Sequence, residues 1–205
     1  LALADFLNMR RGREAAQVAL RQAAKQLPYS TQIPFALAAL YESHQDFAEA
    51  KLVYETLAKD YDKKPAGLDA QVKIAQLAFN AGRQEEAERR LSDVLRQNPR
   101  SAQGLILQGK MALIGRNGKD AVQAFRTVLR DQPELAHVHY LLGQAYMTTG
   151  DSALARESFE RSVALQPSLL DAKLALATME SRSGQSQNAR ARLKAILTSH
   201  PDHQQ

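Results

Sequence analysis

The sequence contains no cysteine among its 205 residues. Without thiols, the chain forms neither a disulfide framework nor a zinc-thiolate site, and it has no cysteine nucleophile. No run reaches the roughly 18 apolar residues of a membrane-spanning helix, and no apolar signal-peptide core is visible. We therefore predict no membrane span in this chain and exclude every function that depends on thiol chemistry.

Glycine and proline are also scarce, with 10 and 7 residues respectively, and they fall at regular places. Alanine, leucine, glutamine and arginine, which favour helices, dominate the rest of the chain. No segment sustains the alternation of apolar and polar residues that is typical of strands. The composition therefore predicts an all-α fold.

Internal spacing shows that the chain is repetitive. Four prolines recur every 34 residues, at Pro99, Pro133, Pro167 and Pro201. Alanines recur at the same interval, at Ala87, Ala121, Ala155 and Ala189, and upstream at Ala16 and Ala50. The gap of 37 residues between Ala50 and Ala87 indicates an insertion of about three residues. Charge, proline and glycine in residues 60–67 predict a lengthened loop there.

One 34-residue period, residues 136–169, carries a full set of marker residues. They are Leu142, Gly143, Tyr146, Gly150, Asp151, Ala155, Phe159 and Pro167. Their order and spacing resemble the tetratricopeptide repeat, a helix–turn–helix unit of 34 residues. The resemblance implies a right-handed superhelical solenoid of about six units in one array over residues 1–205. The units are a truncated 1–30, then 31–67, 68–101, 102–135, 136–169 and 170–203. Because Leu1 enters helical pattern at once, we expect a fragment of a longer chain.

The marker positions have a physical reading. The first helix of each unit has a small residue that lets the two helices approach closely: Ala4, Ala38, Ala75, Gly109, Gly143 and Ala177. The second helix supplies bulk that fills the gap between neighbouring units: Leu20, Tyr54, Leu91, Phe125, Phe159 and Leu193. Gly12, Gly82, Gly150 and Gly184 stand at the helix turns, where positive φ suits glycine. Glu180 departs from the pattern, and we expect a following repeat to satisfy it.

In this family, ligands usually contact the first helices, which line the concave face. Mapping the family's contact places onto this sequence predicts a partner-binding surface with an apolar centre. Its residues are Phe35, Val72, Lys73, Gln76, Phe79, Ile106, Leu107, Lys110, Leu113, His137, Tyr140, Leu141, Gln144 and Met147. The same places also include Gln32, Ala36, Ala39, Ser43 and Asp69. The alternative is that some of these residues pack between adjacent units.

Two known binding modes of the family do not fit this chain. Chaperone-tail receptors hold a terminal carboxylate with lysines and asparagines at the fifth, sixth and ninth places of successive units. Those places are mostly apolar here. The asparagine ladder of a glycosyltransferase groove is absent as well, because the sixth places are alanine, leucine or lysine.

The formal net charge of +5 is spread over units of mixed sign, and the one basic cluster is residues 10–13. Nucleic-acid binding would need a basic stripe with stacking aromatics, so we expect none. His137 and His139 stand two residues apart on a helix and point to different sides, so they do not share a metal. No phosphate loop, metalloprotease motif or nucleophile elbow is present. We expect no enzyme activity and no cofactor or metal.

The leading hypothesis is a non-enzymatic scaffold that binds a peptide or helical segment of a protein in its concave groove. The units resemble those of long bacterial arrays in envelope and exopolysaccharide assembly, which favours a periplasmic or envelope location over the cytoplasmic alternative. The rival hypothesis is a structural spacer or a self-association module that acts through uncapped ends, with no separate ligand.

Overall fold

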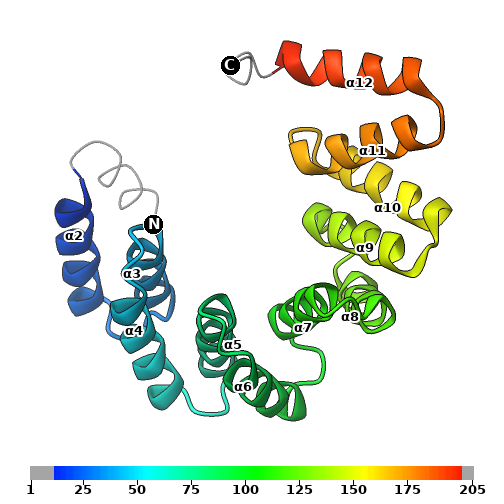
Figure 1. The fold of residues 1–205 in the computed structure, drawn as a ribbon. Helices are drawn as coiled ribbons and strands as arrows, with labels where there is room; N and C mark the ends of the chain where they lie inside the picture. Colours follow the sequence, from blue (N-terminus) through cyan, green and yellow to red (C-terminus); the bar gives the residue numbers. More distant parts are fainter. Residues whose placement is uncertain (1–11, 200–205) are drawn as a thin grey trace. The chain divides into compact units, whose positions relative to one another are not determined.

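The protein is described by a computed structural model that covers residues 12–199 (Figure 1). These residues form eleven helices and no strand. The helices are α2 (Arg13–Gln26), α3 (Gln32–Ser43), α4 (Phe47–Asp60), α5 (Pro65–Asn80), α6 (Gln84–Gln97), α7 (Ala102–Ile114), α8 (Gly118–Asp131), α9 (Ala136–Thr149), α10 (Ser152–Leu165), α11 (Leu170–Arg182) and α12 (Ser186–Ser199). The all-α prediction is confirmed. Ala4, Arg10, Arg11, His200, Pro201 and His203 lie outside the described residues.

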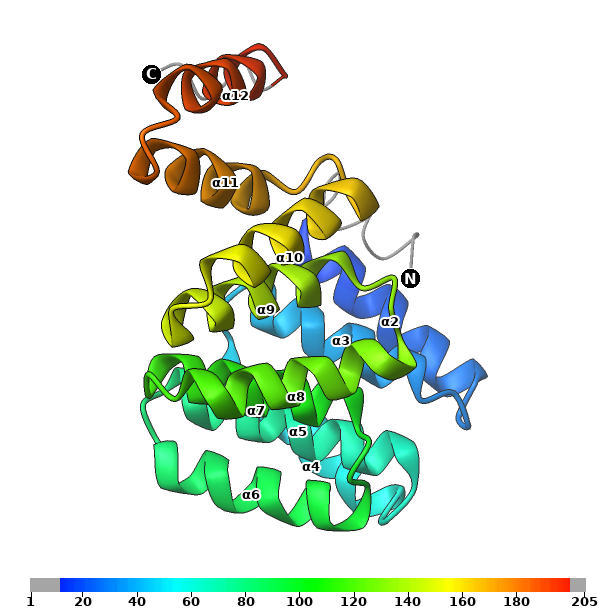
Figure 2. The same ribbon diagram turned by 90° about the vertical axis from the view of Figure 1, so that its right-hand side faces the viewer.

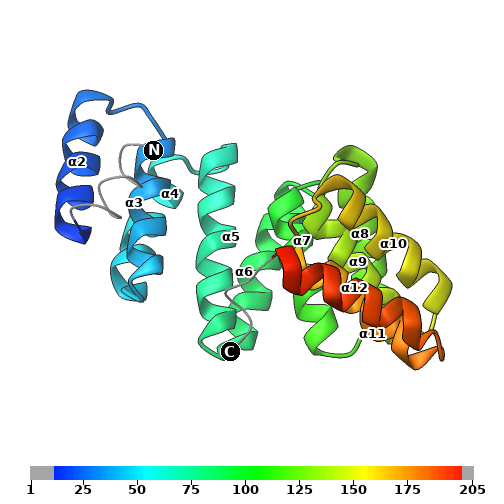
Figure 3. The ribbon, with the colours of Figure 1, turned by 90° about the horizontal axis from the view of Figure 1, so that it is seen from above.

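The chain divides into two compact units, an N-terminal unit (Leu1–Gly104) and a C-terminal unit (Leu105–Gln205). In the N-terminal unit, α4 packs against both α3 and α5 (Figure 3). In the C-terminal unit, α10 packs against both α9 and α11, and α12 covers α11 (Figure 2). Within each unit, a second helix thus bridges its own first helix and the first helix of the next repeat. This stacking makes an apolar core continuous from repeat to repeat.

The turn between the two helices of a repeat has one backbone conformation throughout. Gly82, Gly150 and Gly184 have φ values of 75°, 87° and 79°, as the sequence predicts. The equivalent residues of two other repeats are Gln45 and Arg116, with φ values of 63° and 57°. In the repeat of α9 and α10, the next residue, Asp151, donates its amide to the Tyr146 carbonyl at 2.9 Å. This 6→1 bond ends the helix as a Schellman motif does.

The small and large marker positions pack as predicted in four of the described repeats. A Cβ added to Gly109 would lie 2.5 Å from the Phe125 ring, and one added to Gly143 would lie 2.5 Å from the Phe159 ring. Glycine therefore occurs where the large partner is phenylalanine, and alanine where it is tyrosine or leucine. Leu193 is the exception, because its side chain is 41% exposed. The prediction for Leu193 is wrong, and Ile196 is the buried residue of α12.

The insertion lengthens a helix rather than a loop. α5 has 16 residues and begins at Pro65, three residues before the equivalent start of other repeats. Proline suits the first helical position because its missing N–H would have no partner in the helix. The added turn lies against the end of α4, where a Cβ on Gly67 would stand 2.0 Å from the Tyr61 carbonyl oxygen. Glycine is therefore required at this contact.

Glu180 finds its partner inside its own repeat. Its side chain is 5% exposed, and Arg192 of α12 donates to both carboxylate oxygens, with Nη2 at 2.6 Å from Oε1 and Nε at 3.1 Å from Oε2. The expectation that a following repeat satisfies Glu180 is therefore wrong. The hydrogen bonds from Arg192 hold the pKa of Glu180 below its ordinary value.

Candidate functional site

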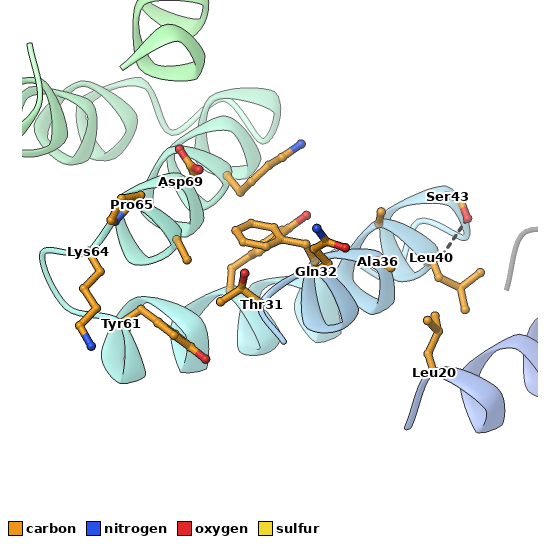
Figure 4. Close-up of a pocket in the computed structure, with 15 residues that line it drawn as sticks. Leu20, Thr31, Gln32, Ala36, Leu40, Ser43, Tyr61, Lys64, Pro65 and Asp69 are labelled. Carbon is orange, nitrogen blue, oxygen red and sulfur yellow. Dashed lines mark hydrogen bonds between the residues drawn. The ribbon is translucent and has the colours of Figure 1, made fainter. Parts of the chain in front are cut away.

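A groove with a volume of about 1020 Å³ lies within the N-terminal unit, between α3 and α5 (Figure 4). It is lined by Leu20, Thr31, Gln32, Phe35, Ala36, Ala39, Leu40, Ser43, Tyr54, Tyr61, Lys64, Pro65, Ala66, Asp69 and Lys73. Figure 4 shows Lys64, Tyr61 and Pro65 toward one end, Gln32 and Ala36 in the middle, and Ser43, Leu40 and Leu20 toward the other end. The groove therefore has ordered ends.

The wall from α3 is apolar and carries no charge. Phe35 packs its ring on Tyr54 of α4, with ring centroids 5.8 Å apart. Tyr54 is 1% exposed, and its hydroxyl donates to Glu42 Oε1 at 2.5 Å. Burial, together with this hydrogen bond, raises the pKa of Tyr54 above its ordinary value. The small side chains of Ala36 and Ala39 leave space above this aromatic floor. This wall suits an apolar partner surface that approaches closely.

The opposite wall comes from α5 and the end of α4, where the insertion lies. Lys64 is the N-cap of α5, and its amine stands 6.0 Å from the centre of the Tyr61 ring. Asp69 and Lys73 follow on the helix, and neither forms an ion pair within residues 12–199. Burial raises the pKa of the Asp69 carboxyl. This wall therefore presents charged groups that are free to meet a partner.

The predicted surface and the observed groove overlap in the N-terminal unit. Phe35 and Lys73 line the groove, as do five further residues of the mapped places: Gln32, Ala36, Ala39, Ser43 and Asp69. Gln76 and Phe79 are half-buried farther along α5, where Gln76 donates to Asn80 Oδ1 at 2.7 Å. Val72 is only 4% exposed, so it belongs to the core and presents no side chain to a partner.

The predicted residues of the C-terminal unit form a second, separate group. Tyr140 packs on Phe159 with ring centroids 5.8 Å apart, and its hydroxyl accepts from Gln144 at 2.8 Å. His137 is exposed, and burial of part of its ring with the nearby charge of Lys110 lowers its pKa. Leu113, Leu141 and Met147 are half-buried. Ile106 and Leu107 are buried, so these two pack in the core as the alternative interpretation holds.

Sequence reasoning missed the groove residues that come from the insertion, which are Tyr61, Lys64, Pro65 and Ala66. The 37-residue gap did locate this segment. The family pattern has no place for inserted residues, however, so it assigned them to a loop outside the binding surface.

The described residues show no other kind of site. Within residues 12–199, no cluster of three or more His, Asp or Glu side chains could hold a metal ion. No helix in that part of the chain is both long enough and apolar enough to cross a membrane.

Comparison with known proteins agrees with the repeat pattern. The family model of the tetratricopeptide repeat matches residues 35–88, 72–125 and 115–169, which together exceed half of the chain. The chain therefore belongs to the tetratricopeptide repeat family. No curated protein sequence matches it.

Several solved structures have the same fold. MamA from Desulfovibrio magneticus RS-1 is 17% identical, with a TM-score of 0.68 over 85% of this chain and 97% of that one. TTC0263, a thermophilic protein of the family from Thermus thermophilus, is 20% identical, with a TM-score of 0.65 over 87% of this chain and 96% of that one. A chain of the APC/C hetero-tetramer Cut9–Hcn1 is 14% identical, with a TM-score of 0.77 over 99% of this chain and 40% of that one. Proteins of this family are generally protein-interaction scaffolds.

Proposed function

We propose that this chain is a scaffold that binds a segment of another protein in the groove between α3 and α5. The single observation that carries the proposal is the groove itself, about 1020 Å³ in volume, with an aromatic floor and small alanines on one wall. Concave sites lined mainly by apolar side chains, with a few polar groups, are the usual places where partners bind.

The groove residues are suited to peptide recognition. Ala36 and Ala39 let a partner main chain approach α3 closely, and Gln32 offers an amide that both donates and accepts hydrogen bonds. Ser43 donates its hydroxyl to the Leu40 carbonyl at 2.8 Å, so its oxygen can still accept from a partner amide. Peptide-binding sites commonly combine such main-chain contacts with pockets for side chains.

The test fills the groove without disturbing the core. A library of random 12-residue peptides is selected against the full chain, and the dissociation constants of selected peptides are measured by fluorescence anisotropy. Ala39 is exposed in the groove, so Ala39→Arg is expected to weaken binding at least about tenfold, which corresponds to about 1.4 kcal/mol.

The matched control is Ser92→Arg, which adds the same side chain at an exposed small residue in the middle of α6. This variant is expected to bind the peptides as the parent does, and circular dichroism should show unchanged helix content for both variants. The proposal fails if no peptide is selected, or if the selected peptides bind the Ala39→Arg protein with undiminished affinity.

A periplasmic or envelope location is proposed only on the resemblance of the units to bacterial envelope arrays. Fractionation of cells that express the parent gene would decide between that location and the cytoplasm.

A further inference from the structure

The charges of the groove are confined to one side and alternate in sign. Three of the fifteen lining residues are charged, and they follow one another as Lys64, Asp69 and Lys73. All three belong to α5 or to its N-cap, whereas the lining residues of α3 carry no charge. Within residues 12–199 none of the three forms an ion pair. The sign order is therefore available to a partner.

The spacing of these charges suits an extended chain. At about 1.5 Å per residue, the five residues from Lys64 to Asp69 and the four from Asp69 to Lys73 span roughly 7.5 Å and 6 Å along the helix. Alternate residues of an extended strand are about 6.6 Å apart and point to the same side. An extended segment can therefore place every second side chain opposite one of these charges.

We infer that the groove selects an extended peptide segment with acidic, basic and acidic residues at alternate positions, facing Lys64, Asp69 and Lys73. The residues in between are apolar and face the uncharged wall of α3. This inference rests on the proposed function and names the chemistry of the partner segment.

The two walls explain why both halves of the pattern are needed. The apolar contacts with Phe35 and the alanines of α3 remove the segment from water and provide most of the affinity. Partly exposed charge pairs contribute about 0.2–1 kcal/mol each. They therefore determine which segment binds rather than how tightly any segment binds. Partial burial of Asp69, which raises its pKa, also favours a basic group opposite it.

The test compares peptides of one composition. An ordered peptide carries Glu, Lys and Glu at alternate positions between leucines, and two scrambled peptides carry Glu, Glu, Lys and Lys, Glu, Glu at those positions. Fluorescence anisotropy with the full chain at low salt is expected to give the ordered peptide about fivefold lower Kd. The preference should fall below about twofold at 0.5 M salt, because salt screens exposed charges.

A charge swap in the protein supplies the matched control. The double variant Asp69→Lys with Lys73→Glu changes the groove order to basic, basic, acidic and alters only exposed positions of α5. This variant is expected to reject the ordered peptide and to prefer one of the two scrambled peptides. The scrambled peptide that it prefers gives the direction of the bound segment.

Three results would overturn the inference. One is equal binding of all three peptides by the parent and the swapped chain, and another is no binding of the ordered peptide. The third is a preference for a peptide with the same charges four residues apart, the spacing of a helix. Failure of the proposed function is distinguishable, because selected peptides would then be absent or insensitive to Ala39→Arg.

Discussion

The segment α3–α4–α5 of the N-terminal unit and the segment α9–α10–α11 of the C-terminal unit use the same marker positions with different residues. In the first, Phe35 packs on Tyr54, and in the second, Tyr140 packs on Phe159, each pair with centroids 5.8 Å apart. The hydroxyl group has changed places between the two rings. In the first segment it is buried and donates to Glu42, whereas in the second it lies nearer the surface and accepts from Gln144.

This exchange teaches that the repeat pattern determines where an aromatic ring lies but not where polar groups are needed. A buried tyrosine needs a partner for its hydroxyl, so Tyr54 comes with Glu42. The ring of Phe159 needs none, and its repeat has Met147 at the place of Glu42. The two segments also differ at the junction after the second helix, where only the first has the inserted turn. The following changes test these differences, beginning with the largest expected effect.

Gly67→Ala would break the junction that distinguishes the first segment. Its Cβ would stand 2.0 Å from the Tyr61 carbonyl oxygen, a backbone atom that cannot move aside as a side chain can. We expect a loss of about 3 kcal/mol in the free energy of unfolding, measured by urea denaturation. A loss below about 1 kcal/mol would show that the added turn of α5 is not held tightly against α4.

Gly143→Ala would give the second segment the small residue that the first has at Ala38. The new methyl would stand 2.5 Å from the Phe159 ring, and we expect a loss of about 2 kcal/mol. Adding Phe159→Leu should recover much of that loss, because Ala75 and Leu91 already form such a pair in another repeat. Urea denaturation of both single variants and the double variant gives the coupling energy, and strict additivity would refute the proposed contact.

Phe159→Tyr would place a hydroxyl in the second segment where the first has one on Tyr54. The side chain of Phe159 is 2% exposed and has no acceptor at the place of Glu42, so the hydroxyl would be buried without a partner. We expect a loss of about 1.5 kcal/mol in unfolding free energy. Adding Met147→Glu should restore at least half of it, and no restoration would mean that the two repeats pack their aromatic pairs differently.

The next repeat sharpens the comparison, because Glu180 stands where the two segments have Tyr41 and Tyr146. Arg192 holds the pKa of Glu180 below its ordinary value of 4.5, so the ion pair stabilises the fold fully above that pH. This contribution is lost as pH falls through the lowered pKa. We expect Glu180→Gln to lower the unfolding free energy by about 1 kcal/mol at pH 7.

The same comparison at low pH provides the control for Glu180. The difference between the parent and Glu180→Gln should shrink when urea denaturation is repeated below pH 4, because the parent then loses the same charge. A difference that stays constant with pH would assign the effect to packing rather than to charge.

Gln45→Gly would give the first segment the turn residue that the second has at Gly150. Gln45 has a φ of 63°, a conformation that costs an L-residue energy and costs glycine none. We expect a gain of about 0.5 kcal/mol, partly offset by the greater freedom of glycine in the unfolded chain. The thermal midpoint should rise slightly, and the reverse change, Gly150→Ala, should lower it. A lowered midpoint for Gln45→Gly would mean that the glutamine side chain stabilises this turn.

The sequence predicted most of the fold because the relevant interactions are local and repeated. Turn glycines, small first-helix residues and large second-helix residues recur at one spacing, and each repeat supports the interpretation of the others. The candidate site was predicted less completely. Mapping placed Phe35, Lys73 and five of their neighbours on the groove. It also included Val72, Ile106 and Leu107, which are buried, because the position in a repeat does not reveal how a neighbouring element covers it.

By itself, then, the sequence determined the helical repeat, the family and the face of α3 that lines the groove, since these depend on periodic spacing along the chain. Only the tertiary structure decided that the insertion extends α5, that Lys64 and Tyr61 join the groove, and that Arg192 satisfies Glu180. Each of these depends on a contact between residues of different helices. Such contacts depend on how the helices pack against each other, which periodic spacing does not specify.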